Sequence, residues 1–120
     1  MSWEARVVDV ADGDTITVEP AKGGNRVKVR LHGIDAPELR QPYGQTAKSF
    51  VAEATLFKIV NVRPTPQRTD RYGRTVAVVE LLDGVLQELL LEAGLAWIVS
   101  SVLQKLQSMG VSRGKSTKSE

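Results

Sequence analysis

The stretch RVKVRLHGIDAPE, residues 26–38, joins a strand pattern to a run of polar residues. In its first half, Val and Leu alternate strictly with Arg, Lys and His. Because successive side chains of a strand point to opposite faces, this alternation predicts a strand that is buried on one face. The same period of two places Arg30 on the outward face, a few residues before the carboxylates of Asp35 and Glu38.

Further strands are predicted on both sides of this stretch. Residues 6–10 and 15–18 flank the dipeptide Asp12-Gly13, which is typical of hairpin turns. Residues 58–63 and 75–82 have the composition of two more strands. Between them lies a polar segment that contains proline, and it is predicted to be a loop over Pro64–Arg74.

Two helices complete the pattern. Apolar residues follow helical spacing over residues 44–56 and again over residues 86–93, where Gly94 is placed to end the helix. Five strands with two helices predict a mainly β fold with α elements (α+β). We expect a five-stranded barrel close to the oligonucleotide/oligosaccharide-binding (OB) fold, with the helices packed against it.

The length and composition of the chain indicate a single domain, and its charge balance favours a localised binding site. The chain has 120 residues and no cysteine, so one core must form without disulfides or thiolate metal sites. It contains 16 basic and 14 acidic residues, and three of the basic residues with one acidic residue lie in residues 112–120. The net charge of +2 therefore belongs to the tail. A balanced body argues against coating a nucleic-acid duplex and favours a localised site.

Three polar motifs together supply the groups that a metal-dependent phosphodiester hydrolase needs. They are the turn at residues 12–15, the second half of the opening stretch, and RTDRYGR at residues 68–74. Oxygen ligands for a divalent cation are offered by Asp14 and Asp35. Glu38 offers a carboxylate that can handle a water molecule, and two guanidinium groups for a phosphate come from Arg30 and Arg74.

Each motif alone also has a plainer interpretation. The first is a common hairpin turn. Asp35 could cap a helix, with Glu38 reaching back as in a capping box. Residues 71–74 could be an ordinary solvated loop. The occurrence of all three motifs in this context favours the functional interpretation, because the weight of a motif grows with the context that it requires.

These motifs, in this order and with similar spacing, resemble those of the staphylococcal nuclease (thermonuclease) family over Arg6 to Trp97. The resemblance implies a calcium-dependent nuclease that hydrolyses phosphodiester bonds of DNA and RNA with little sequence specificity. It assigns calcium binding to the carboxylates of Asp14 and Asp35 and to the backbone carbonyl of Ala36, where the family often has Thr.

The resemblance also assigns the remaining site residues. Glu38 matches the general base or water-orienting carboxylate, and Arg30 and Arg74 match the two arginines that hold the scissile phosphate. Arg71 and Tyr72 match a Lys-Tyr pair that contacts a terminal phosphate of the nucleotide. The implied partners are single-stranded or locally opened DNA and RNA.

The C-terminal part departs from the family pattern. After Trp97 the family usually has tyrosines that help to hold the base, and none is present here. Residues 99–109 predict one short amphipathic helix, so the last helix is shortened or replaced. The nuclease-like domain is expected to span residues 1–110, followed by a disordered basic Ser/Lys-rich tail over residues 111–120. The apolar face of the short helix suggests a homodimer through this segment.

The sequence also bears on the location of the protein and on an alternative function. The chain shows neither a signal peptide nor a membrane span, so we expect it to be cytoplasmic as written, or secreted or periplasmic if a leader was removed. The alternative function is a non-catalytic or weakly active OB-fold module that binds nucleic acid. A barrel that acts only by base stacking is poorly supported, because the chain has two Phe, two Tyr and two Trp.

Overall fold

The computed structural model describes residues 2–98, with side chains described throughout except at positions 67 and 68. Its main element is a sheet in which β3, β2, β1, β5 and β6 are neighbours in that order, and a parallel pairing of β3 with β6 closes it. The prediction of a five-stranded OB-like barrel is confirmed. The strands are β1 (Trp3–Asp12), β2 (Thr15–Pro20), β3 (Val27–Leu31), β5 (Ile59–Thr69) and β6 (Thr75–Leu81).

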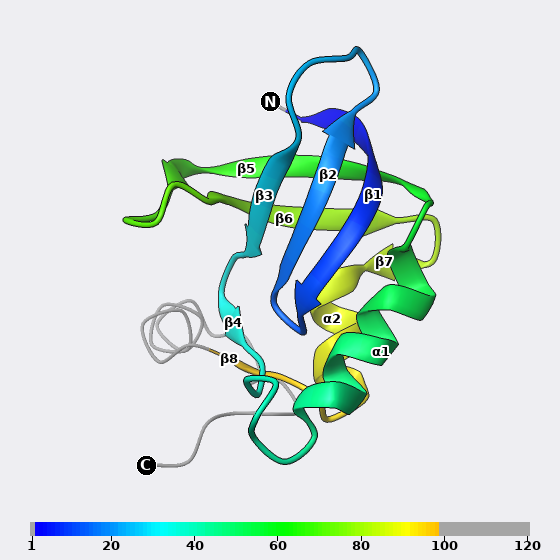
Figure 1. The fold of residues 1–120 in the computed structure, drawn as a ribbon, viewed down its shortest axis with the longest axis vertical. Coiled ribbons are helices and arrows are strands. Elements are labelled where there is room, and N and C mark those ends of the chain that lie inside the picture. The colour runs from blue at the N-terminus through cyan, green and yellow to red at the C-terminus, as the bar shows by residue number, and fades with distance from the viewer. Residues whose placement is uncertain (1, 99–120) are drawn as a thin grey trace, which may run out of the picture.

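Shorter elements gather at one end of this barrel (Figure 1). A short strand β7 (Gly84–Val85) pairs with β6 and leads directly into α2 (Leu86–Glu92). Two two-residue strands, β4 (Ile34–Asp35) and β8 (Trp97–Ile98), pair antiparallel, and α1 (Gly44–Thr55) lies nearby. The β2–β3 connection lies at the opposite end.

The core follows the alternation of the strands. Val29 and Leu31 of β3 are buried, as the opening stretch predicts, and Ile16 and Val18 of β2 face them from the same interior. The helices add buried side chains on one face each, Ala47 and Val51 of α1 and Leu86 and Leu90 of α2. Burial of this apolar surface stabilises the barrel and fixes the ends of its strands.

The predicted loop over Pro64–Arg74 is wrong for its first half, since β5 continues to Thr69. Proline lacks an N–H donor and is excluded from central strands, but it is tolerated where one edge of the strand is unpaired. The pairing of β1 with β5 ends where Trp3 lies opposite Val62. Pro64 lies beyond that point, still opposite Ala77 of β6, so its missing donor leaves no β1 acceptor unpaired.

Some expectations concern other parts of the chain. The short helix at residues 99–109, the tail at residues 111–120 and the dimer contact all lie outside the described residues. Within residues 2–98, none of the helices has the length and apolar character needed to cross a membrane.

Candidate active site

Arg30 is the centre of a cluster formed where β3, β4 and the β1–β2 turn meet. Its guanidinium contacts two carboxylates: Nη2 lies 3.6 Å from Asp14 Oδ2 and is paired with Asp35 Oδ1. The other terminal nitrogen, Nη1, donates to the carbonyl oxygens of Leu31 and Ile34, each at 2.8 Å. The Arg30 side chain is only 18% exposed, so these contacts fix its direction.

Asp14 is held in place by three groups. The backbone N–H of Ala36 donates to Oδ2 at 3.2 Å, and the hydroxyl of Thr15 donates to Oδ1 at 3.1 Å. The backbone N–H of Asp14 itself donates to Asp12 Oδ1 at 3.1 Å. The pKa of Asp14 is raised from 3.8 to about 6, chiefly by burial and also by the Asp12 side chain, although Arg30 and the Ala36 N–H lower it. The protonated form of this carboxyl is therefore favoured by its surroundings more than that of an ordinary aspartate.

Arg74 reaches the same cluster from the β5–β6 loop. Its Nη1 donates to the Thr15 hydroxyl at 3.2 Å, so Thr15 links Arg74 to Asp14. Its Nε donates to Asp70 Oδ2 at 2.7 Å. Desolvation opposes ionisation of Asp70, but hydrogen bonds from the backbone N–H groups of Arg74 and Tyr72 and from the Arg74 guanidinium lower its pKa overall. The loop thus carries its own ionised anchor for Arg74.

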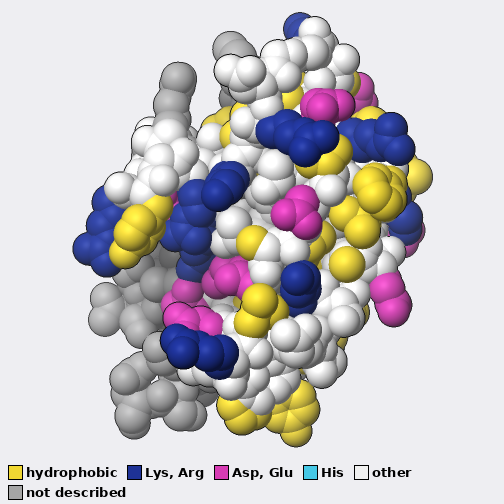
Figure 2. Space-filling model, viewed as in Figure 1, with side chains coloured by type: hydrophobic (Ala, Val, Ile, Leu, Met, Phe, Trp, Pro, Cys, Tyr) yellow, Lys and Arg dark blue, Asp and Glu magenta, His cyan; other side chains and the backbone are white. Residues whose placement is uncertain are grey.

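Arg71 and Tyr72 lie on the outer side of this loop. The Arg71 and Arg74 guanidinium carbons lie 5.0 and 5.2 Å from the centre of the Tyr72 ring. Tyr72 is 68% exposed. The three side chains form a cation–π group in which the Tyr72 phenol and the Arg71 guanidinium are exposed to a ligand. Figure 2 shows basic and acidic side chains side by side over the β3–β4 region.

Glu38 occupies an exposed position beside the cluster without joining it. Its carboxylate makes no hydrogen bond or ion pair with any described residue, whereas its backbone N–H donates to Gln41 Oε1 at 2.7 Å. The capping-box interpretation of Asp35 and Glu38 is wrong, because α1 begins only at Gly44 and its N-cap, Tyr43, makes no side-chain cap. The carboxylate is free to turn toward a water molecule or a substrate.

The residues assigned to calcium suit a hard cation only in part. Among the described residues, no group of three or more Asp, Glu, His or Cys side chains is arranged to hold a metal ion. Asp14 and Asp35 do converge on one point, which the guanidinium of Arg30 occupies. Two carboxylates and the Ala36 carbonyl would fill part of the six to eight positions that Ca²⁺ prefers.

Sequence reasoning missed the residues that connect the site. Thr15 and Asp70 lie within the first and third motifs, but the motifs predict no role for either residue. Gly13 is needed because a Cβ there would lie 2.8 Å from the Cβ atoms of both Ala36 and Ala47. A sequence signal existed for Asp70, since Asp four residues before Arg suits a turn-stabilising pair, but nothing in the sequence indicates contacts between distant segments.

Comparison with known proteins identifies the family of the chain. The family described as Staphylococcal nuclease homologue matches residues 28–113. An uncharacterized endonuclease of Haemophilus influenzae is 41% identical over 92 residues, covering 77% of this chain and 50% of that protein. A thermonuclease of Staphylococcus hyicus is 38% identical over 97 residues, covering 76% and 56%.

A micrococcal nuclease of Shigella flexneri is 42% identical over 77 residues, covering 64% of this chain and 42% of that protein. The chain therefore spans about half the length of the curated relatives that it matches. The family match covers well over half of the chain, and the closed barrel agrees with it. The chain belongs to the staphylococcal nuclease homologue family.

Proposed function

We propose that this chain is a calcium-dependent nuclease that hydrolyses phosphodiester bonds of DNA and RNA with little sequence specificity. The observation that carries the proposal is the single hydrogen-bonded cluster in which Arg30, Asp14, Asp35 and, through Thr15, Arg74 meet. These groups come from four separate segments. Relatives named thermonuclease, micrococcal nuclease and endonuclease support the same reaction class.

The two arginines suit the phosphate. A phosphodiester is anionic, and its transition state concentrates charge on the non-bridging oxygens, so fixed guanidinium donors stabilise it. The described contacts of Arg74 engage Nε and Nη1, which leaves Nη2 for a phosphate oxygen. Arg30 is held by two carbonyls and two carboxylates. Ca²⁺ held by Asp14 and Asp35 would replace the contacts of Arg30 Nη2 with these carboxylates, and this nitrogen would then be available to a phosphate oxygen.

Asp14, Asp35 and the carbonyl of Ala36 would hold Ca²⁺, which supplies positive charge to the phosphate. Glu38 would take a proton from the attacking water or orient it, as its exposed and unpaired carboxylate allows. Arg71 and Tyr72 would contact a terminal phosphate of the nucleotide, on the exposed outer side of the loop. All of these contacts address phosphate, so little base selectivity is expected.

The test is cleavage of single-stranded DNA and of RNA by the wild type, by Glu38→Ala and by Glu53→Ala, in calcium and in excess chelator. Glu53 is an exposed glutamate on α1, which makes it a matched control for lost charge. We expect calcium-dependent cleavage that is greatly reduced in Glu38→Ala and unchanged in Glu53→Ala. A folded wild type that cleaves neither substrate would instead indicate a binding module of the same fold.

A further inference from the structure

A cavity lies at the end of the barrel opposite the Arg30 cluster. Its volume is about 490 Å³, within the range of small-molecule sites, and barrel mouths are a preferred location for such sites. It is lined by the beginning of β1, the end of β2, the β2–β3 connection, Val27 of β3 and Asn61 of β5. None of the residues assigned to catalysis contributes to it.

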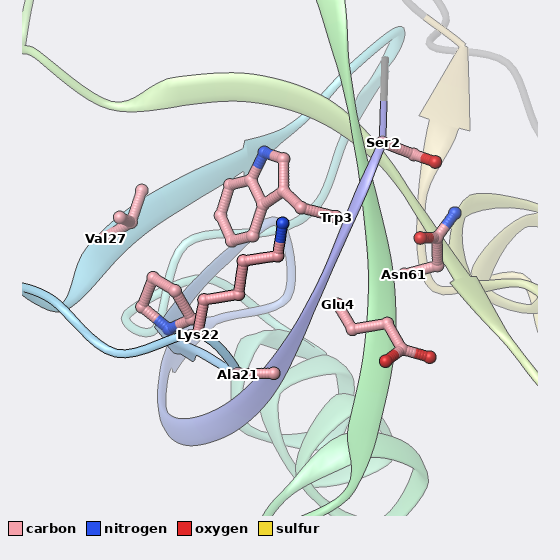
Figure 3. Close-up of a pocket in the computed structure, with 8 residues that line it drawn as sticks. Ser2, Trp3, Glu4, Ala21, Lys22, Val27 and Asn61 are labelled. Carbon is pink, nitrogen blue, oxygen red and sulfur yellow. The ribbon is translucent and has the colours of Figure 1, made fainter.

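The walls of this cavity differ in chemistry. Figure 3 shows the indole of Trp3 and the side chains of Lys22 and Val27 on one side of the β1 ribbon, with Glu4 and Asn61 on the other. Trp3 is only partly buried, so part of its ring faces the cavity. Lys22 is exposed, and its ammonium has no ion-pair partner among the described residues. A partly exposed aromatic ring beside an unpaired lysine suits a ligand that combines a planar ring with a negative charge, such as the base and phosphate of a nucleotide.

A row of cations connects the two ends of the barrel. Arg26, Lys28 and Arg30 alternate with the inward-facing residues of β3, so they share its outward side. Residues two apart in a strand are separated by about 7 Å. Arg26 is paired with Glu19 at 3.5 Å, whereas Lys28 is exposed and has no ion-pair partner in the described part of the chain. The row runs along β3 from Arg30 toward the end of the barrel that holds the cavity.

We propose that this cavity is a second nucleic-acid subsite, which binds a base of the same strand whose phosphate is held at Arg30. The Trp3 indole stacks on the base, Lys22 contacts the phosphate of that nucleotide, and Lys28 contacts a phosphate between the two sites. Base stacking on aromatic side chains combined with a cationic track is how OB folds hold single strands without sequence preference. This inference rests on the proposed nuclease function, and it adds a dependence on substrate length.

The test compares a dinucleotide, too short to reach Trp3, with a dodecanucleotide, which is within the roughly 4–16 nucleotides that one OB fold covers. The variants are Trp3→Leu, Trp3→Phe, which keeps a ring, and Lys22→Ala. Lys58→Ala removes an exposed lysine away from the row and is the charge-matched control. Thermal unfolding of every variant checks that it is folded.

We expect KM for the dodecanucleotide to rise about fivefold or more in Trp3→Leu. A smaller rise is expected in Lys22→Ala, and Trp3→Phe should recover most of the loss. The value of kcat/KM for the dinucleotide should stay unchanged in all of them. Equal effects on both substrates, or no effect on the dodecanucleotide, would overturn the subsite, and Lys22→Ala gives this answer even where Trp3→Leu fails to fold.

A fluorescence titration separates this proposal from the nuclease activity. In excess chelator, the dodecanucleotide should quench the indole emission of the wild type. The Trp3→Phe variant, which retains Trp97, should show little quenching. If the wild type cleaves neither substrate, the proposed function fails, and this titration still decides the subsite. Quenching that persists unchanged in Trp3→Phe would contradict it.

Discussion

The side chain of Thr15 links the Asp14 carboxylate to the Arg74 guanidinium. Its hydroxyl donates to Asp14 and accepts from Arg74, and the residue is only 5% exposed. A hydroxyl can do both because it carries one donor and two acceptor lone pairs. The position of the guanidinium that should hold phosphate is thus tied to the carboxylate that should hold calcium.

Replacing Thr15 by Val tests this link, because Val has nearly the same shape and no hydroxyl. Arg74 Nη1 then loses an acceptor, and a hydrogen bond to a charged group is worth about 1.5–3 kcal/mol. We expect kcat on single-stranded DNA to fall by roughly tenfold or more. Steady-state kinetics of Thr15→Val and of the control Thr15→Ser, which keeps the hydroxyl, would measure this. Equal activity in the two variants would refute the link.

Asp70 gives the Arg74 loop a pH-dependent contribution to stability. Its pKa is lower in the folded protein than the ordinary value of 3.8, since hydrogen bonds from Arg74 and Tyr72 outweigh its desolvation. The ionised form is therefore favoured by folding. This stabilisation is present above pH 4 and is lost as the pH falls through the folded-state pKa.

Asp70→Asn should accordingly unfold at a lower temperature than the wild type at pH 7. The difference between the two proteins should shrink as the pH falls below 4. Thermal melts of both proteins across this range would show it, and a difference that does not change with pH would contradict the role of the charge. Reduced activity of the variant at pH 7 is also expected, since Arg74 loses its ionic anchor.

The sequence predicted the types of site residue better than their contacts. The structure brings together Asp14, Arg30, Asp35 and Arg74, all of which the motifs singled out. The catalytic and metal-binding roles of these residues stay predictions. The role of Thr15 could not be predicted, because a linking hydroxyl is recognised only when both of its partners are placed. The pairing of Asp70 with Arg74 had a local sequence signal, the spacing of four residues.

Among the secondary-structure elements, α1 and the segment before it determine where Glu38 lies. Gly44, the first residue of α1, is packed so closely that a Cβ there would lie 2.0 Å from the Glu38 carbonyl oxygen. The Gln41 side-chain oxygen accepts a hydrogen bond from the Glu38 N–H. This bond stabilises the turn formed by residues 38–41. The helix thus supports the backbone that carries the candidate base.

The substitution Gly44→Ala tests whether the close contact with the Glu38 backbone outweighs the higher helix propensity of Ala. Helix propensity alone favours Ala by up to about 1 kcal/mol. Overpacking against rigid backbone typically costs about 1–3 kcal/mol. We expect a net loss in the free energy of unfolding by denaturant, together with lower activity. The exposed control Ser49→Ala in the same helix should be neutral or slightly stabilising. A more stable Gly44→Ala would show that the segment can move away at little cost.

Strand alternation predicted β3 well because its neighbours bury one face along its whole length. It failed for β5 because whether proline is acceptable depends on where β1 ends, and that is a property of the assembled sheet. Two-residue strands such as β4 and β8 carry no periodic signal at all. Their pairing nevertheless places Asp35 opposite Trp97.

At the scale of the whole barrel, the buried carboxylate of Asp14 lowers the free energy of unfolding. A bound cation should remove this loss of stability. Burial raises the pKa of Asp14 to about 6, so folding disfavours its charged form. The unfolded chain loses this proton near pH 4 and the folded protein near pH 6. Stability without metal should therefore fall as the pH rises from 4 to 6, and the cost should be complete above pH 6.

Calcium should reverse this cost, because it binds the folded protein and not the unfolded chain. At a free concentration a hundred times Kd, such binding adds about 2.7 kcal/mol to the free energy of unfolding. Thermal melts at pH 7.5 should show a Tm that rises with millimolar calcium and falls again with chelator. In chelator, Asp14→Asn should melt above the wild type, because the buried charge is gone, and calcium should no longer raise its Tm. A variant that responds to calcium as the wild type does would place the metal elsewhere on the barrel.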